Sequence, residues 1–138
     1  MAPFTFFDHT GDIGVDLSAP TASGLFSLAG LALFEAIADT SGVRPMVVRK
    51  LQIAADSQEE LLNRFLSALL VIFDDERLLL PHVAIHEMDG RSLRATAAGE
   101  RFDPELHEGR TELKAVTWHA LHVSRQNGLW TARVVFDV

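Results

Sequence analysis

The sequence predicts an α+β fold in which a mostly antiparallel sheet carries two helices packed on one face. Two segments in the first part of the chain, residues 21–39 and 61–76, have apolar side chains at helical spacing. Two hairpin patterns follow, each centred on a tight-turn dipeptide, Asp89-Gly90 or Asn127-Gly128. Two helices followed by two hairpins are typical of the α+β class.

Length and composition favour one globular domain, residues 1–138. The chain is 48% hydrophobic and 22% charged, which is typical of globular proteins. It contains no cysteine, which excludes disulfides and thiolate metal sites, and its net charge of −7 disfavours direct binding to nucleic acid. Because neither a signal-peptide pattern nor an apolar segment of membrane-spanning length occurs, we expect a cytoplasmic protein without membrane contact.

The first predicted elements follow a cluster of polar residues and glycines, "FFDHTGDIG" at residues 6–14. From this cluster alone, a turn, an active site and a metal site all stay open. Residues 14–20 then alternate apolar and polar side chains up to a proline, which predicts a short strand. The wide apolar face of residues 21–39 predicts a deeply buried helix.

A second strand and helix are predicted next. Residues 47–55 alternate between an apolar and a polar face, as expected for a strand with one side in solvent. Ser57 and Glu60 have the spacing of a capping box, in which the hydroxyl accepts from the amide of Glu60 and the carboxylate reaches back to the amide of Ser57. The capping box therefore predicts the start of the second helix.

After Pro81 the period of the apolar residues changes to two, which predicts strands. The first hairpin surrounds Asp89-Gly90, and the second joins residues 111–124 to the end of the chain through Asn127-Gly128. Residues 99–112 form a polar connection that is much longer than the roughly 2 to 5 residues of most hairpin loops. Such a connection is either a functional loop or a surface loop without a function of its own.

Carboxylates near the two ends of the chain suggest a cation site. Asp137 and the α-carboxylate of Val138 place two anionic groups within one residue, and Asp12 lies close to two glycines, which allow the backbone to approach a ligand. Carboxylate oxygens suit a hard cation such as calcium or magnesium. From spacing alone, a turn is the more frequent explanation of an Asp-Gly cluster.

No familiar catalytic signature occurs in the chain. The six histidines do not form a zinc motif, and no nucleophile elbow, phosphate-binding glycine loop or HExxH sequence is present. The residues still leave two alternatives open beside a cation-binding accessory protein. One is a metal-dependent hydrolase or nucleotide-processing enzyme built from His9, Asp12 and the long connection, and the other is a binding module whose carboxylates only cap a turn.

Six segments, taken in order, resemble the archease family across nearly the whole chain. They are "DHTGDIG", "LFSLAGLALFEAI", "ELLNRFLSALLVIFDDE", "GERFDPELHE", "ELKAVTWHAL" and "ARVVFDV". Each segment is short, but their number and order make the resemblance specific. The sequence departs from the family pattern mildly, with Asp8 in place of Glu, Gly11 in place of Ala, Trp118 in place of Tyr and Val138 in place of Ile.

The resemblance implies a compact α+β protein that is not itself an enzyme. It implies a cofactor that activates an RtcB-type RNA ligase by promoting its guanylylation and multiple turnover, in tRNA splicing or RNA repair. That ligase joins RNA ends bearing a 2′,3′-cyclic phosphate or 3′-phosphate to a 5′-hydroxyl. Because this chain is acidic, we expect contact with the basic ligase rather than with RNA.

The resemblance also implies a divalent-cation site, with calcium as the expected ion. Its ligands would be Asp12, Asp137 and Val138, the last through its backbone or terminal carboxylate. The polar motifs shared with the family imply a surface that faces the ligase, without individual roles for its residues: His9, Glu100, His107, Lys114 and His119.

Overall fold

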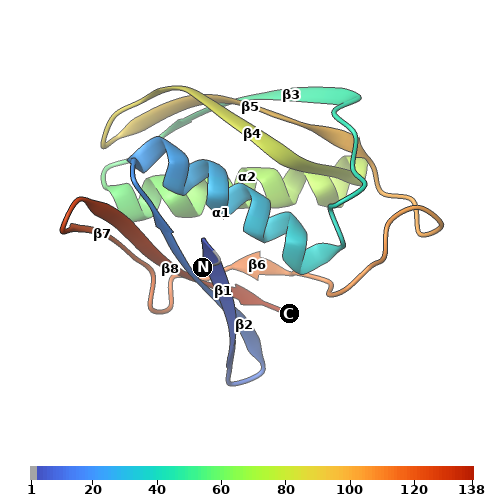
Figure 1. The fold of residues 1–138 in the computed structure, drawn as a ribbon, viewed down its shortest axis with the longest axis horizontal. Coiled ribbons are helices and arrows are strands. Elements are labelled where there is room, and N and C mark those ends of the chain that lie inside the picture. Colours follow the sequence, from blue (N-terminus) through green and yellow to red (C-terminus); the bar gives the residue numbers. More distant parts are fainter. Residues whose placement is uncertain (1–2) are drawn as a thin grey trace.

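Two helices and eight strands follow one another in residues 3–138, the part of the chain that the computed structural model describes (Figure 1). Residues 1 and 2 of the predicted domain lie outside it. In chain order, the elements are β1 (Phe4–His9), β2 (Asp12–Ala19), α1 (Ala22–Ile37), β3 (Val47–Ala54), α2 (Gln58–Glu76), β4 (Leu78–Met88), β5 (Ser92–Arg101), β6 (Ala115–Val116), β7 (His122–Gln126) and β8 (Leu129–Asp137).

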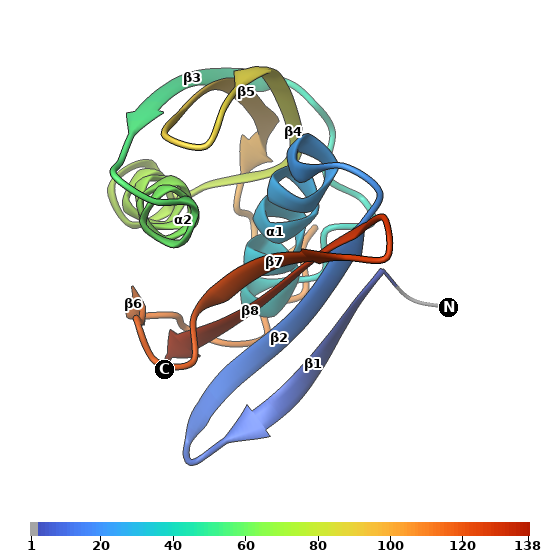
Figure 2. The ribbon, with the colours of Figure 1, turned by 90° about the vertical axis from the view of Figure 1, so that its left-hand side faces the viewer.

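The strands form two antiparallel sheets with the helices between them (Figure 2). One sheet has five strands in the order β1-β2-β8-β6, with β7 also paired to β8, and the other has three strands in the order β3-β5-β4. The predicted α+β class is confirmed. The strands are divided between two sheets rather than one, because α1 and α2 present apolar side chains to both sides of the helix layer.

The helices begin where their capping residues place them. The hydroxyl of Thr21 accepts from the Gly24 amide at 3.0 Å before α1, and the hydroxyl of Ser57 accepts from the Glu60 amide at 3.1 Å before α2. The Glu60 carboxylate accepts from the amide of Asp56 at 3.1 Å, one residue before the predicted donor. Neither helix of the described residues combines the length and the apolar character needed to cross a membrane.

The core lies on both sides of the helix layer. Gly30 of α1 is so close to β4 that a Cβ atom there would approach the Val83 Cγ2 atom to 2.8 Å, so the glycine allows α1 to pack on this strand. The largest side chains with less than 2% exposure come from both helices and both sheets, and they include Phe26, Phe34, Phe65, Leu79 and Phe136.

Both predicted hairpins form, but the strand predicted over residues 111–124 does not run continuously. The hairpins are β4–β5 and β7–β8, and Asn127 and Gly128 of the second turn have φ values of 53° and 79°. Only β6 and β7 remain of the predicted strand, separated by residues 117–121. From Val116 to His122 the chain advances six positions while the paired residues on β8, Phe136 and Arg133, are only three apart, so the intervening residues leave the pairing.

Candidate functional site

The segment "FFDHTGDIG" folds into a hairpin between β1 and β2. Thr10 and Gly11 form its two-residue turn with φ values of 42° and 86°. A threonine rarely adopts a positive φ, so this turn stores backbone strain. The turn pairs His9 directly with Asp12, and directly paired residues have their side chains on the same face of the sheet.

The pairing of β2 with β8 brings the two ends of the chain together. The paired residues run from Ala19 and Trp130 to Ile13 and Phe136. Continued by one position, the same register aligns Asp12, the first residue of β2, with Asp137, the last residue of β8, at the end of the five-stranded sheet. His9, Asp12 and Asp137 therefore follow one another across three neighbouring strands on one sheet face.

This pair of carboxylates is chemically suited to a hard cation. Within residues 3–138, neither the Asp12 nor the Asp137 carboxylate forms an ion pair or a hydrogen bond with another side chain. Two unpaired carboxylates on adjacent strands repel each other unless a cation lies between them. Three His, Cys, Asp or Glu side chains that could hold a metal ion do not converge anywhere in the described residues.

Three of the predicted partner-facing residues lie beside these carboxylates. The rings of His9 and His119 are in contact at a tilt of 50°, with a centroid separation of 4.5 Å. The buried Nδ1 atom of His9 has no hydrogen-bond partner in the described part of the chain. The main-chain amide of Lys114 donates to the carbonyl of Asp137 at 2.8 Å. His9, Lys114, His119 and the two carboxylates thus share one end of the five-stranded sheet.

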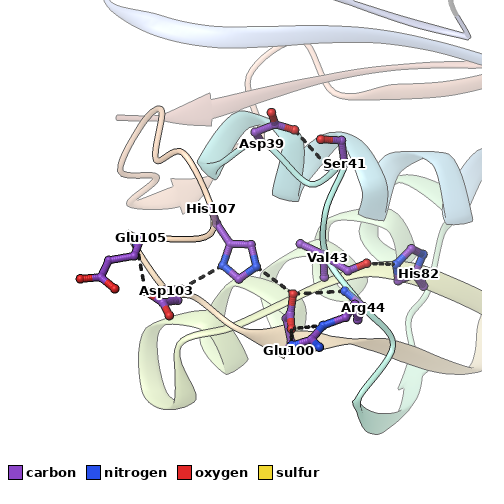
Figure 3. A network of polar contacts seen from close by, with 9 residues as sticks. All are labelled: Asp39, Ser41, Val43, Arg44, His82, Glu100, Asp103, Glu105 and His107. Carbon is purple, nitrogen blue, oxygen red and sulfur yellow. Dashed lines mark hydrogen bonds and ion pairs between the residues drawn. The ribbon is translucent and has the colours of Figure 1, made fainter.

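The other two predicted partner-facing residues, Glu100 and His107, form a separate buried network (Figure 3). Arg44 donates to the Glu100 carboxylate through its amide, Nε and Nη2 atoms at 3.2, 3.1 and 3.0 Å. On the other side, the Nε2 atom of His107 lies 2.9 Å from Glu100 Oε2. The hydrogen bonds from His107 and then from Arg44 lower the pKa of Glu100 below its ordinary value.

The tautomer of His107 follows from its second contact. The amide of Asp103 donates to His107 Nδ1 at 2.9 Å, so this nitrogen cannot carry a proton. The proton of the neutral ring is therefore on Nε2 and is donated to Glu100. Glu100 is only 8% exposed and His107 only 2%, so both side chains are buried within the fold, where they hold the chain after β5 in place. Contact of these two residues with a partner stays a prediction.

The long connection after β5 is thus an ordered part of the fold. Its later half is tied to the end of α1, where Arg110 Nη1 donates to the Glu35 carboxylate at 2.6 Å and to the Glu35 carbonyl at 2.9 Å. No sequence pattern indicates this ion pair, because its residues belong to distant segments with no shared motif. A cavity of about 370 Å³ between this ion pair and the β1–β2 hairpin is lined by both of its residues and by Asp8 and Ile13.

Comparison with known proteins accounts for nearly the whole chain. The Archease protein family (MTH1598/TM1083) matches residues 4–138. Protein archease of Sulfolobus acidocaldarius is 36% identical over 139 residues, and that of Methanothermobacter thermautotrophicus is 39% identical over 141 residues, with 100% of each chain covered in both cases.

Solved structures are similar to this chain in fold. The solution structure of Methanobacterium thermoautotrophicum protein 1598 has 39% identity and a TM-score of 0.84, and 100% of each chain is covered. The crystal structure of an archease from Thermotoga maritima, described as a possible chaperone, has a TM-score of 0.70 over 96% of this chain and 94% of that one. At 22% identity, the second likeness concerns the fold alone. By its match over residues 4–138 and its full-length relatives, the chain belongs to the archease family.

Proposed function

We propose that this protein is a non-catalytic accessory factor of an RtcB-type RNA ligase. It promotes guanylylation and multiple turnover of the ligase in tRNA splicing or RNA repair, and it acts in the cytoplasm. Membership of the archease family supports this proposal.

The observation that carries the proposal is the juxtaposition of Asp12 and Asp137 at the end of the five-stranded sheet. With an oxygen of Val138, their carboxylates form the proposed site for a divalent cation, for which we propose calcium. A bound cation would neutralise the two carboxylates and link the first hairpin to the last strand. This end of the sheet would then have a fixed shape for the ligase to bind.

The charge of the protein favours a protein partner over direct contact with RNA. The net charge of −7 repels the phosphates of RNA, whereas a ligase that binds RNA must present basic side chains. Electrostatic complementarity then accelerates the encounter between the accessory protein and the ligase.

A guanylylation assay tests the proposal directly. The ligase is incubated with labelled GTP and a divalent metal, alone or with the wild-type protein, the Asp12→Asn variant or the Asp74→Asn variant. Asp74 is an exposed aspartate near the end of α2 and serves as the matched control. We expect wild type and Asp74→Asn to increase the rate of ligase-GMP formation, and Asp12→Asn to increase it much less.

Two results of the same assay would contradict the proposal. If the wild-type protein leaves the rate of ligase guanylylation unchanged, the accessory role is excluded. Turnover of GTP or of RNA ends by the protein without ligase, lost in Asp12→Asn, would instead establish the metal-dependent enzyme.

A further inference from the structure

Trp118 is a large side chain that the fold holds in solvent. Its exposed fraction is 60%, whereas aromatic side chains normally contribute to a protein core. It belongs to residues 117–121 between β6 and β7, a segment that we call the Trp118 turn. An exposed tryptophan adds little to the stability of the folded chain, whereas tryptophan is among the residues that contribute most to the free energy of protein–protein binding.

The Trp118 turn is fixed by a buried side chain of α2. Asn63, which is only 6% exposed, donates from its Nδ2 atom to the carbonyls of Val116 at 3.2 Å and Thr117 at 3.3 Å. The Thr117 amide donates to the carbonyl of Val135 on β8 at 3.0 Å. The residues directly before Trp118 are therefore held by a helix on one side and by a strand on the other.

The turn closes in a strained conformation. The amide of His119 donates to the Thr117 hydroxyl at 3.2 Å, and Ala120 has a φ of 55°. Alanine is disfavoured in this left-handed region because its Cβ atom approaches the following carbonyl oxygen. The surrounding hydrogen bonds offset this strain and fix the main chain on either side of Trp118, which reduces the backbone entropy lost when a partner binds the turn.

The Trp118 turn borders the candidate cation site. The ring of His119 contacts the ring of His9, and His9 is paired with Asp12 across the first hairpin. β6, which leads into the turn, is paired with Asp137. One surface therefore combines an exposed indole with two carboxylates that have no ion-pair partner in the described residues.

We propose that Trp118 anchors a protein-docking surface formed by the Trp118 turn, His9 and the carboxylates of Asp12 and Asp137. Its partner is a protein surface in which an apolar pocket for the indole is flanked by basic side chains. This inference rests on the proposed accessory function, and it assigns that surface to the RNA ligase. A nucleic-acid base stacked on Trp118 is disfavoured, because its phosphates would approach both carboxylates.

Fluorine NMR can report on the environment of Trp118 in the complex, separately from every other side chain. Trp118 and Trp130 are the two tryptophans of the chain, so Trp130→Phe labelled with 5-fluorotryptophan carries one fluorine probe, which remains distinct when unlabelled ligase is added. We expect the fluorine resonance of Trp118 to shift and to lose its sensitivity to solvent deuterium when the ligase binds. An unchanged resonance in a complex confirmed by sedimentation would overturn the inference.

Affinity measurements give a second test. Calorimetric titration of the ligase should show binding weakened on the order of 30-fold by Trp118→Ala and less by Trp118→Phe. Leu106→Ala is the matched control, because Leu106 is 66% exposed and belongs to the connection between β5 and β6, outside the Trp118 turn. Circular dichroism establishes that each variant is folded.

The outcomes separate this inference from the function on which it rests. Absence of ligase binding by the wild-type protein would overturn the accessory function together with the inference. Equal ligase binding by wild type and Trp118→Ala would overturn only the docking role of Trp118. A fluorine shift that is caused by single-stranded RNA and not by the ligase would reassign the surface to RNA. A shift that appears when the protein alone is concentrated would reassign the surface to a second copy of the chain. Either result would overturn the docking role proposed for Trp118.

Discussion

The Nε2 atom of His107 donates a hydrogen bond to the Glu100 carboxylate at 2.9 Å, from a ring whose other nitrogen accepts the Asp103 amide. Arg44 binds the same carboxylate with its amide and its guanidinium group. A buried carboxylate is tolerated only with partners of this kind, because desolvation disfavours an unpaired charge. The network thereby joins the start of the β5–β6 connection to the segment that precedes β3.

Stability is predicted to decrease in acid through Glu100. Its pKa in the folded chain lies below its ordinary value of 4.5, because His107 and Arg44 donate to the ionised form. The contribution of the carboxylate is therefore fully present above about pH 4.5 and is lost as the pH falls through the lower folded-state pKa. The Glu100→Gln variant should be about 2 kcal/mol less stable at neutral pH.

Urea unfolding of both proteins, from neutral pH down to about pH 3, checks this prediction. The difference between their free energies of unfolding should shrink as the pH decreases below the ordinary value. A difference that is independent of pH would show that the charge of Glu100 contributes nothing.

Removal of the His107 ring is predicted to destabilise the fold by about 2 to 3 kcal/mol. His107→Ala leaves the Glu100 oxygen and the Asp103 amide without this partner and opens a cavity at a site that is 2% exposed. His86→Ala is the control, since the ring of His86 is exposed and bonds only the Thr96 hydroxyl in the described residues. Urea unfolding should change by about 0.5 kcal/mol or less for the control, and equal losses in the two variants would contradict the prediction.

Gly99→Ala is predicted to be strongly destabilising, by about 2 kcal/mol or more. A Cβ atom at Gly99 would lie 1.7 Å from the carbonyl oxygen of Leu79, and a main-chain oxygen inside a strand pair cannot move aside without breaking the pairing of β4 and β5. Gly42→Ala is the matched control, because a Cβ atom there meets nothing within 4 Å. Thermal unfolding at neutral pH compares the two variants, and equal midpoints would contradict this account of Gly99.

The elements that sequence analysis predicted well are those that depend on neighbouring residues. The capping residue Ser57 and the turn dipeptide Asn127-Gly128 act within a few positions of their own location, so they mark α2 and the last hairpin correctly. The separation of β6 from β7 was missed because its causes are distant: Asn63 and Val135 bind the intervening residues from α2 and β8. The alternation of apolar side chains within a segment does not indicate which distant residues will form hydrogen bonds with it.

The candidate site divides in the same way. From the residues alone, the proximity of Asp12 and Asp137 was one of several alternatives, because the register between β2 and β8 is set by long-range pairing; the family resemblance favoured it. The polar character of Glu100 and His107 suggested exposure, whereas each residue is buried because the other satisfies its hydrogen bonds. Polarity alone therefore predicts the exposure of a side chain poorly when a residue that can form a hydrogen bond with it lies a few positions away along the chain.

Calcium is predicted to stabilise the protein through Asp12 and Asp137. A ligand that binds only the folded state at a concentration about 100 times its Kd adds about 2.7 kcal/mol, which raises the Tm of a chain of this length by several degrees. The Asp12→Asn variant should lose this calcium-dependent increase, whereas Asp74→Asn should retain it. In chelator, Asp12→Asn should be at least as stable as wild type, because the substitution removes the repulsion between two neighbouring carboxylates. Differential scanning calorimetry with calcium and with chelator measures both effects, and an Asp12→Asn variant that responds to calcium as wild type does would exclude this aspartate as a ligand.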